Sequence, residues 1–215
     1  MAAIGPMPIG SAIWSVHQGA IPILGSMVRP SRVLMFTGSL RSGSTNTALL
    51  RTAQAVAPEG MAARLYEGLG RLPLFNPDDD VVPLHPAVAD LRAGIAGADA
   101  LLFSTPEYAG ALPGPLKNLL DWTVGGGETY GKPVAWINAS GSPTGAAEAH
   151  RSLRTVLGYT GSDIVEGACA HIPVARSAVG SDGLIVDGTV RKEIRDALGA
   201  LSSHLGEQAD PPARR

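Results

Sequence analysis

Short apolar runs alternate along most of the chain with segments whose apolar residues recur at helical spacing. The compact runs, rich in aliphatic and β-branched side chains, are typical of buried strands, and we expect them at 32–37, 63–67, 98–105, 132–140 and 162–172. The periodic segments predict helices around 49–56, 86–97, 111–124, 145–157 and 190–205. This alternation favours one α/β domain with a parallel sheet that helices cover on both faces.

The two ends of the chain depart from this pattern. Residues 1–30 are apolar, but Gly, Pro and Ser interrupt them throughout, and Arg29 is their first basic side chain, which does not fit a secretory signal peptide. We expect 1–30 to be a disordered extension or an over-called start, with Met27 as the alternative start. The domain is expected at 31–206, and a polar tail follows at 207–215.

The composition excludes several classes of partner. The 215 residues are 45% hydrophobic and 17% charged with a formal net charge of −2, so no basic surface for nucleic acid or anionic lipid is expected. No apolar run is long enough to cross a membrane. The one cysteine, Cys169, excludes an internal disulfide and fits a reducing compartment. We therefore expect a cytoplasmic protein with neither nucleic acid nor membrane as its partner.

The segment GSLRSGSTN at 38–46 connects the first expected strand directly to a helix. The unpaired N–H groups and the dipole at the amino end of a helix favour a bound anion. Further donors come from the side chains of Ser39, Arg41, Ser44, Thr45 and Asn46. A plain helix cap by Ser44 or Thr45 is the alternative interpretation. Because five donors with an arginine exceed what a cap requires, the segment favours a site for a phosphate monoester.

Two further loops follow expected strands whose carboxyl ends meet the same edge of a parallel sheet. Pro106, Glu107 and Tyr108 come directly after the third strand, and the small polar segment SGSPTG at 140–145 ends the fourth. Loops of this kind can border a flat aromatic ligand. They are equally ordinary connections, so the residues alone leave both interpretations open.

Taken together, these loops resemble those of the NADPH-dependent FMN reductase family of flavodoxin-like flavoproteins, which includes quinone, azo-dye and chromate reductases. The resemblance covers about 31–200 and rests on the motifs at 38–46, 106–122 and 131–157. It implies a flavodoxin-like three-layer sandwich in which a five-stranded parallel sheet, in the order 2-1-3-4-5, has helices on both faces.

The resemblance also implies a role for each loop. In the family the first loop holds the FMN phosphate, which would involve Ser39, Arg41, Ser44 and Asn46, with Thr45 close by. The second loop borders the isoalloxazine ring and the third flanks its other side, which points to Pro106, Glu107, Tyr108, Ser140, Gly141 and Gly145. One departure concerns Ala146, because the family often has a second glycine at this position, and the alanine methyl group would narrow that edge of the pocket.

The implied activity is hydride transfer from NADPH, or NADH, through FMN to a small acceptor such as a quinone, a flavin, an azo compound or chromate. A ping-pong mechanism follows from this chemistry, with no catalytic side chain required. The family also implies a homodimer or a dimer of dimers. No metal is expected, because the run Asp78–Asp80 is typical of a solvated acidic loop.

Three alternative functions remain open. A one-electron carrier like flavodoxin would share the fold, although such carriers are typically more acidic than a chain with a net charge of −2. A low-molecular-weight phosphatase needs a nucleophilic cysteine in the first loop, whereas Cys169 lies far along the chain. An FMN-binding protein without enzymatic activity is compatible with every motif, because fold does not imply function.

Overall fold

The computed structural model of the chain describes residues 29–209. The strands are β1 (Ser31–Thr37), β2 (Met61–Leu65), β3 (Ala100–Ser104), β4 (Pro133–Asn138), β5 (Asp163–Ile164) and β6 (Ala170–His171). The α-helices are α1 (Thr45–Ala55), α2 (Pro86–Ala96), α3 (Gly114–Asp121), α4 (Ala147–Tyr159) and α5 (Gly188–Ala209). Most of the expected extension at 1–30 and the end of the expected tail therefore lie outside the described residues.

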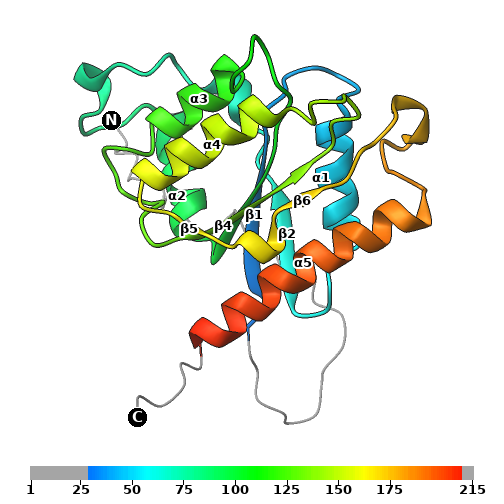
Figure 1. Cartoon of the computed structure of the whole chain (residues 1–215). Coiled ribbons are helices and arrows are strands. Elements are labelled where there is room, and N and C mark those ends of the chain that lie inside the picture. Colours follow the sequence, from blue (N-terminus) through cyan, green and yellow to red (C-terminus); the bar gives the residue numbers. More distant parts are fainter. Residues whose placement is uncertain (1–28, 210–215) are drawn as a thin grey trace, which may run out of the picture.

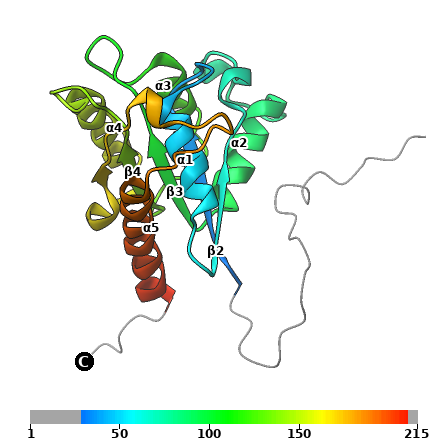
Figure 2. The same ribbon diagram turned by 90° about the vertical axis from the view of Figure 1, so that its right-hand side faces the viewer.

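The strands form one parallel sheet in the order β2-β1-β3-β4-β5, and β6 also pairs with β4. Helices α2, α3 and α4 lie on one face of this sheet and α1 and α5 on the other (Figure 1). The expected three-layer arrangement and strand order are confirmed. The loops that follow β1, β3 and β4 gather at one end of the molecule, opposite the carboxyl end of α5 (Figure 2).

The central strand β1 shows why the strand runs are continuously apolar. Val33 and Met35 pack toward α1 and α5, whereas Leu34 and Phe36 pack toward the helices of the opposite face. All four side chains are essentially inaccessible to solvent. Successive side chains of a strand alternate between faces, so a strand covered on both sides requires an apolar residue at every position.

Most elements differ from their predicted ranges by a few residues at the ends, and two differences affect the carboxyl-terminal part of the domain. The expected fifth strand at 162–172 is split into β5 and β6, because a 3₁₀ helix at Glu166–Ala168 interrupts it. Helix α5 continues to Ala209, beyond the expected domain boundary at 206. Within residues 29–209, no helix combines the length and the apolar character that crossing a membrane requires.

Candidate functional site

The first loop ends at the amino terminus of α1. Ser44 is the N-cap residue, and its hydroxyl oxygen accepts a hydrogen bond from Thr47 N at 3.4 Å. The first turn of α1 contains no acidic residue. Ser44, one of the five expected donors, therefore caps the helix, as in the alternative interpretation of this segment as a plain helix cap. The other backbone N–H groups at this helix end have no carboxylate in their own turn.

Two polar side chains of the first loop are buried and fix its shape. Ser39 is buried, and its hydroxyl oxygen accepts a hydrogen bond from Arg41 N at 3.2 Å. Asn46 is also buried, and its Oδ1 accepts a hydrogen bond from the Ser104 hydroxyl at 2.9 Å, which ties α1 to the end of β3. The Arg41 side chain is exposed and has no hydrogen bond or ion pair with the part of the chain that the structure describes.

The first and second loops are in close contact. Gly38 N donates to Ser104 O at 2.8 Å, and a Cβ atom at Gly38 would lie 2.1 Å from the Thr105 hydroxyl oxygen. A side chain at position 38 would therefore separate the two loops. The glycine is required by this close approach.

A hollow of about 500 Å³ opens between the three loops, and we call it the central hollow. It brings together residues of all three sequence-predicted segments: Thr45, Asn46, Pro106, Glu107, Ser140 and Gly141. A second hollow of about 450 Å³, the outer hollow, lies between the first loop and the end of β2 and is lined by Ser39 and Arg41. The two hollows thus lie on either side of the first loop.

Three of the expected site residues line neither hollow. Ser44 is buried as the cap of α1. Tyr108 is 52% exposed, and its backbone pairs with Ala111 in a tight turn. Gly145 lies at the back of the third loop, where a Cβ atom would meet the His171 ring at 3.3 Å.

The Glu107 side chain connects the second loop to α4. Its Oε2 accepts hydrogen bonds from Glu148 N at 2.9 Å and from Ala149 N at 3.1 Å. These are N–H groups of the first turn of α4, whose own N-cap residue, Ala146, provides no side-chain cap. The carboxylate of Glu107 therefore caps a helix that lies some forty residues further along the chain.

The third loop is held in a strained conformation. Gly145 and Ala146 both have a left-handed backbone, with φ of +58° and +52°. Glycine adopts this conformation freely, whereas alanine does so at a cost of roughly 1–2 kcal/mol. Two successive left-handed positions explain why a second glycine suits position 146, and why the alanine of this chain requires support from its surroundings.

That support comes from three side chains behind the loop. The Asn138 amide accepts from Ser140 N at 2.9 Å and donates to Gly145 O. His171 Nε2 donates to Ser140 O at 2.7 Å, and His150 Nδ1 donates to Ala146 O at 2.8 Å. Burial lowers the pKa of His150 below its ordinary value, so the neutral ring is favoured in this position.

Sequence reasoning missed one part of the central hollow. Val174 and Arg176 line it from the connection between β6 and α5, which none of the three quoted loops includes. In the sequence, polar residues directly after the first, third and fourth strands indicate which loops lie at this edge of the sheet. Val174 and Arg176 could not be found in the same way, because the sequence does not show that the fifth strand is split.

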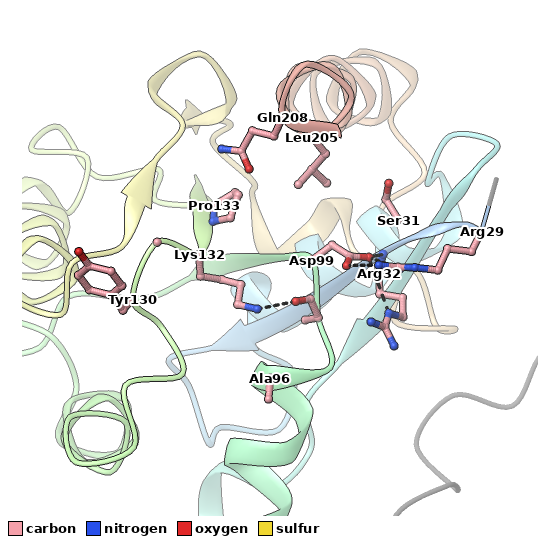
Figure 3. Close-up of a pocket in the computed structure, with 12 residues that line it drawn as sticks. Arg29, Ser31, Arg32, Ala96, Asp99, Tyr130, Lys132, Pro133, Leu205 and Gln208 are labelled. Carbon is pink, nitrogen blue, oxygen red and sulfur yellow. Dashed lines mark hydrogen bonds and ion pairs between the residues drawn. The ribbon is translucent and has the colours of Figure 1, made fainter. Parts of the chain in front are cut away.

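A further hollow of about 670 Å³ lies at the opposite edge of the sheet. Figure 3 shows Arg29, Arg32 and Lys132 around Asp99 at the amino ends of the strands. The Asp99 carboxylate accepts from Arg29 at 2.7 Å and from Arg32 N at 2.8 Å, and Lys132 Nζ donates to Ala98 O at 2.7 Å. These cations have structural partners, so the hollow is explained without a ligand.

The thiol of Cys169 and the acidic loop that contains Asp80 both have structural explanations. Burial raises the pKa of the Cys169 thiol to about 11, which keeps it protonated and unreactive at neutral pH. Asp80 forms an ion pair with Arg92 at 2.8 Å. No group of three or more potential metal-ligating side chains occurs within the described part of the chain. Trp122 is fully buried.

A comparison with protein families matches residues 31–176 to a family model described as NADPH-dependent FMN reductase. The chain belongs to this family. The resemblance expected from the three loops is thereby confirmed, and the chain is an oxidoreductase whose expected cofactors, FMN and NADPH, are those in the family's description.

Named relatives agree with this membership. NAD(P)H-dependent FMN reductase PA1204 of Pseudomonas aeruginosa is 38% identical over 172 residues, which are 79% of this chain and 92% of the relative. A 2-hydroxy-1,4-benzoquinone reductase of a Burkholderia species is 34% identical over 168 residues, 76% of this chain and 90% of the relative. Among solved structures, the flavoenzyme NAD(P)H:(acceptor) oxidoreductase FerB of Paracoccus denitrificans superposes with a TM-score of 0.73 at 30% identity, covering 82% of this chain and 98% of FerB.

The Glu107 contact makes a testable prediction. Glu107→Ala removes the acceptor of two N–H groups of α4, so we expect the free energy of unfolding to fall by about 1–2 kcal/mol in urea denaturation. Glu107→Gln keeps an oxygen acceptor without the charge and should lose less. Glu59→Ala, which removes an exposed carboxylate from the loop before β2, is the matched control. Equal stability of Glu107→Ala and Glu59→Ala would show that the cap has no energetic role.

Proposed function

We propose that the enzyme passes hydride from NADPH, by way of FMN bound in the central hollow, to a small acceptor, with a quinone as the leading candidate. The relative named as a benzoquinone reductase supports the acceptor class. The cytoplasm, where NADPH is the common reductant, is the proposed compartment.

The donor set at the carboxyl edge fits the phosphate of FMN. The amino end of α1 has no acidic residue, and Arg41 and the buried Ser39 and Asn46 lie in the loop that leads into it or in its first turn. The amino end of α4, by contrast, is already occupied by the Glu107 carboxylate. This difference between the two helix ends is the observation that carries the proposal, because of the two only the amino end of α1 is free to stabilise a bound anion.

The geometry also fits a flat ring between the second and third loops. Pro106 and Glu107 line the central hollow on one side, and Ser140 and Gly141 line it on the other. A Cβ atom at Gly141 would meet nothing within 4 Å, so the loop presents open backbone to the hollow. We propose that these backbone groups hold the isoalloxazine edge. The phosphate would lie at the amino end of α1, between Thr45 and Asn46 of the central hollow and Ser39 and Arg41 of the outer hollow.

FMN, when bound, supplies a ring that takes up hydride and gives it to a second molecule. The residues of the chain position and orient the reactants. Among the described residues that line the central hollow there is no histidine, and the one carboxylate, that of Glu107, is hydrogen-bonded to α4 and so is not available for proton transfer. We therefore propose that donor and acceptor use the same open face in turn. Flavins, azo compounds and chromate are further candidate acceptors for such a face.

The order of the reaction can be tested by steady-state kinetics. With NADPH varied at several fixed concentrations of 1,4-benzoquinone, the FMN-loaded enzyme is expected to give parallel double-reciprocal lines, because the oxidised donor leaves before the quinone enters. Intersecting lines would contradict the shared face and indicate a ternary complex. An FMN-loaded protein that consumes no NADPH with any of these acceptors would favour the carrier or the non-catalytic alternative.

We further propose that the enzyme is a homodimer that associates through the carboxyl ends of α3 and α4. Three large apolar or aromatic side chains are exposed there: Val124 is 62%, Tyr130 80% and Tyr159 91% exposed. They line a hollow of about 560 Å³ between the two helix ends. Exposed apolar surface of this kind is typical of protein–protein contacts, and a second copy is the partner that the family resemblance implies.

The dimer predicts a solution mass of twice the 22.1 kDa of one chain in sedimentation equilibrium. Tyr159→Glu places a charge in the contact and is expected to shift the protein to monomer. Val186→Glu makes the same kind of change at a 71% exposed apolar residue before α5 and should leave the mass unchanged. A wild-type monomer would contradict the dimer, and a Tyr159→Glu dimer would place the contact elsewhere.

A further inference from the structure

The amino ends of α1 and α4 both face the carboxyl edge of the sheet, but the groups bound to them differ. The first turn of α4 receives the Glu107 carboxylate at 2.9 and 3.1 Å. The first turn of α1 has only the neutral cap of Ser44. The amino end of α1 therefore presents the positive end of its helix dipole, with no carboxylate in its first turn.

Arg176 adds a second positive group to this hollow. It is the only basic residue among the described residues that line it, and Glu107 is the only acidic one. The Arg176 side chain is exposed and makes no hydrogen bond or ion pair with residues 29–209. By comparison, Arg29, Arg92 and Arg154 are each paired with a carboxylate. A guanidinium beside an uncompensated helix amino end is suited to an anion.

The backbone that leads to Arg176 is fixed to the end of β4, next to the third loop. Ile172 N donates to Asn138 O at 2.8 Å, and Val174 N donates to Ala139 O at 3.1 Å. Val174 is buried in the core that α1 and α5 share. Arg176 then begins the short 3₁₀ helix Arg176–Ala178. Its Cα is thereby held next to the third loop, while its side chain extends to the hollow.

We propose that Arg176 binds a phosphate group of a nucleotide ligand in the central hollow, opposite the contribution of α1. This proposal rests on the proposed function, since it assigns a residue to the same site. Arginine matches phosphate with a planar fork of donors, which a lysine does not reproduce. The phosphate has two possible sources, the flavin nucleotide and the nicotinamide donor, and both present the same chemistry to the guanidinium.

The test compares Arg176→Gln and Arg176→Lys with Arg195→Gln, which removes the same charge from an exposed position on α5. The affinity of the full-length apoprotein for FMN and for riboflavin is measured by quenching of flavin fluorescence. If Arg176 binds the flavin phosphate, FMN affinity falls roughly 10- to 100-fold in Arg176→Gln and riboflavin affinity is unchanged. Arg176→Lys recovers part of the loss, and Arg195→Gln changes neither affinity.

If Arg176 instead binds a phosphate of the nicotinamide nucleotide, the variants are expected to show a different pattern of affinities. FMN affinity then stays at the wild-type value, and the FMN-loaded Arg176→Gln protein binds NADP⁺ roughly 10- to 100-fold more weakly in calorimetry. A loss for NADP⁺ without one for NAD⁺ assigns the guanidinium to the 2′-phosphate, and an equal loss for both assigns it to the pyrophosphate.

Two results would overturn the proposal. One is an Arg176→Gln protein with unchanged affinity for FMN and NADP⁺. The other is an equal loss for FMN and riboflavin, which would indicate a changed hollow rather than a lost phosphate contact. A wild-type protein that binds no FMN would overturn the proposed function itself. This result can be distinguished from a failure of the Arg176 proposal, because it is obtained with the wild-type protein before any variant is made.

Discussion

The carboxylate of Glu107 at the amino end of α4 is the contact on which the arrangement of the carboxyl edge depends. It joins the loop after β3 to the helix after β4 with two hydrogen bonds from backbone N–H groups. It also occupies the amino end of α4, where an anion would otherwise be stabilised. The amino end of α1, by contrast, has no acid in its first turn. One side chain thus sets both the geometry and the charge of the site.

Three side chains behind the third loop explain how this strained loop keeps its shape. Gly145 and Ala146 have left-handed backbones directly before α4, and Asn138, His150 and His171 bind their carbonyl groups or that of Ser140 from behind. The face toward the central hollow therefore presents small residues and open backbone. A rigid, open face of this kind suits a flavin that exchanges hydride with more than one partner molecule, because the specificity lies in the cofactor and not in a catalytic side chain.

Much of the fold could be predicted from the sequence, because continuous apolar runs and helical periodicity report burial directly. The parallel sheet with helices on both faces agrees with those patterns, and the strand order agrees with the family resemblance. Asn46, Pro106 and Ser140 meet at one hollow. Arg176 could not be found, since an apolar run cannot distinguish an interrupted strand from a continuous one. The Glu107 cap has no local signal either, because its partners are separated from it by some forty residues.

The most direct test is the visible absorbance spectrum of the FMN-loaded protein under anaerobic conditions. Addition of NADPH is expected to bleach the flavin bands, and 1,4-benzoquinone is expected to restore them. Such a cycle would establish that the bound flavin takes up hydride from NADPH and is then reoxidised by the quinone. Bands that persist after NADPH is added would contradict the reductase, and a protein that retains no FMN would contradict the anion site at α1.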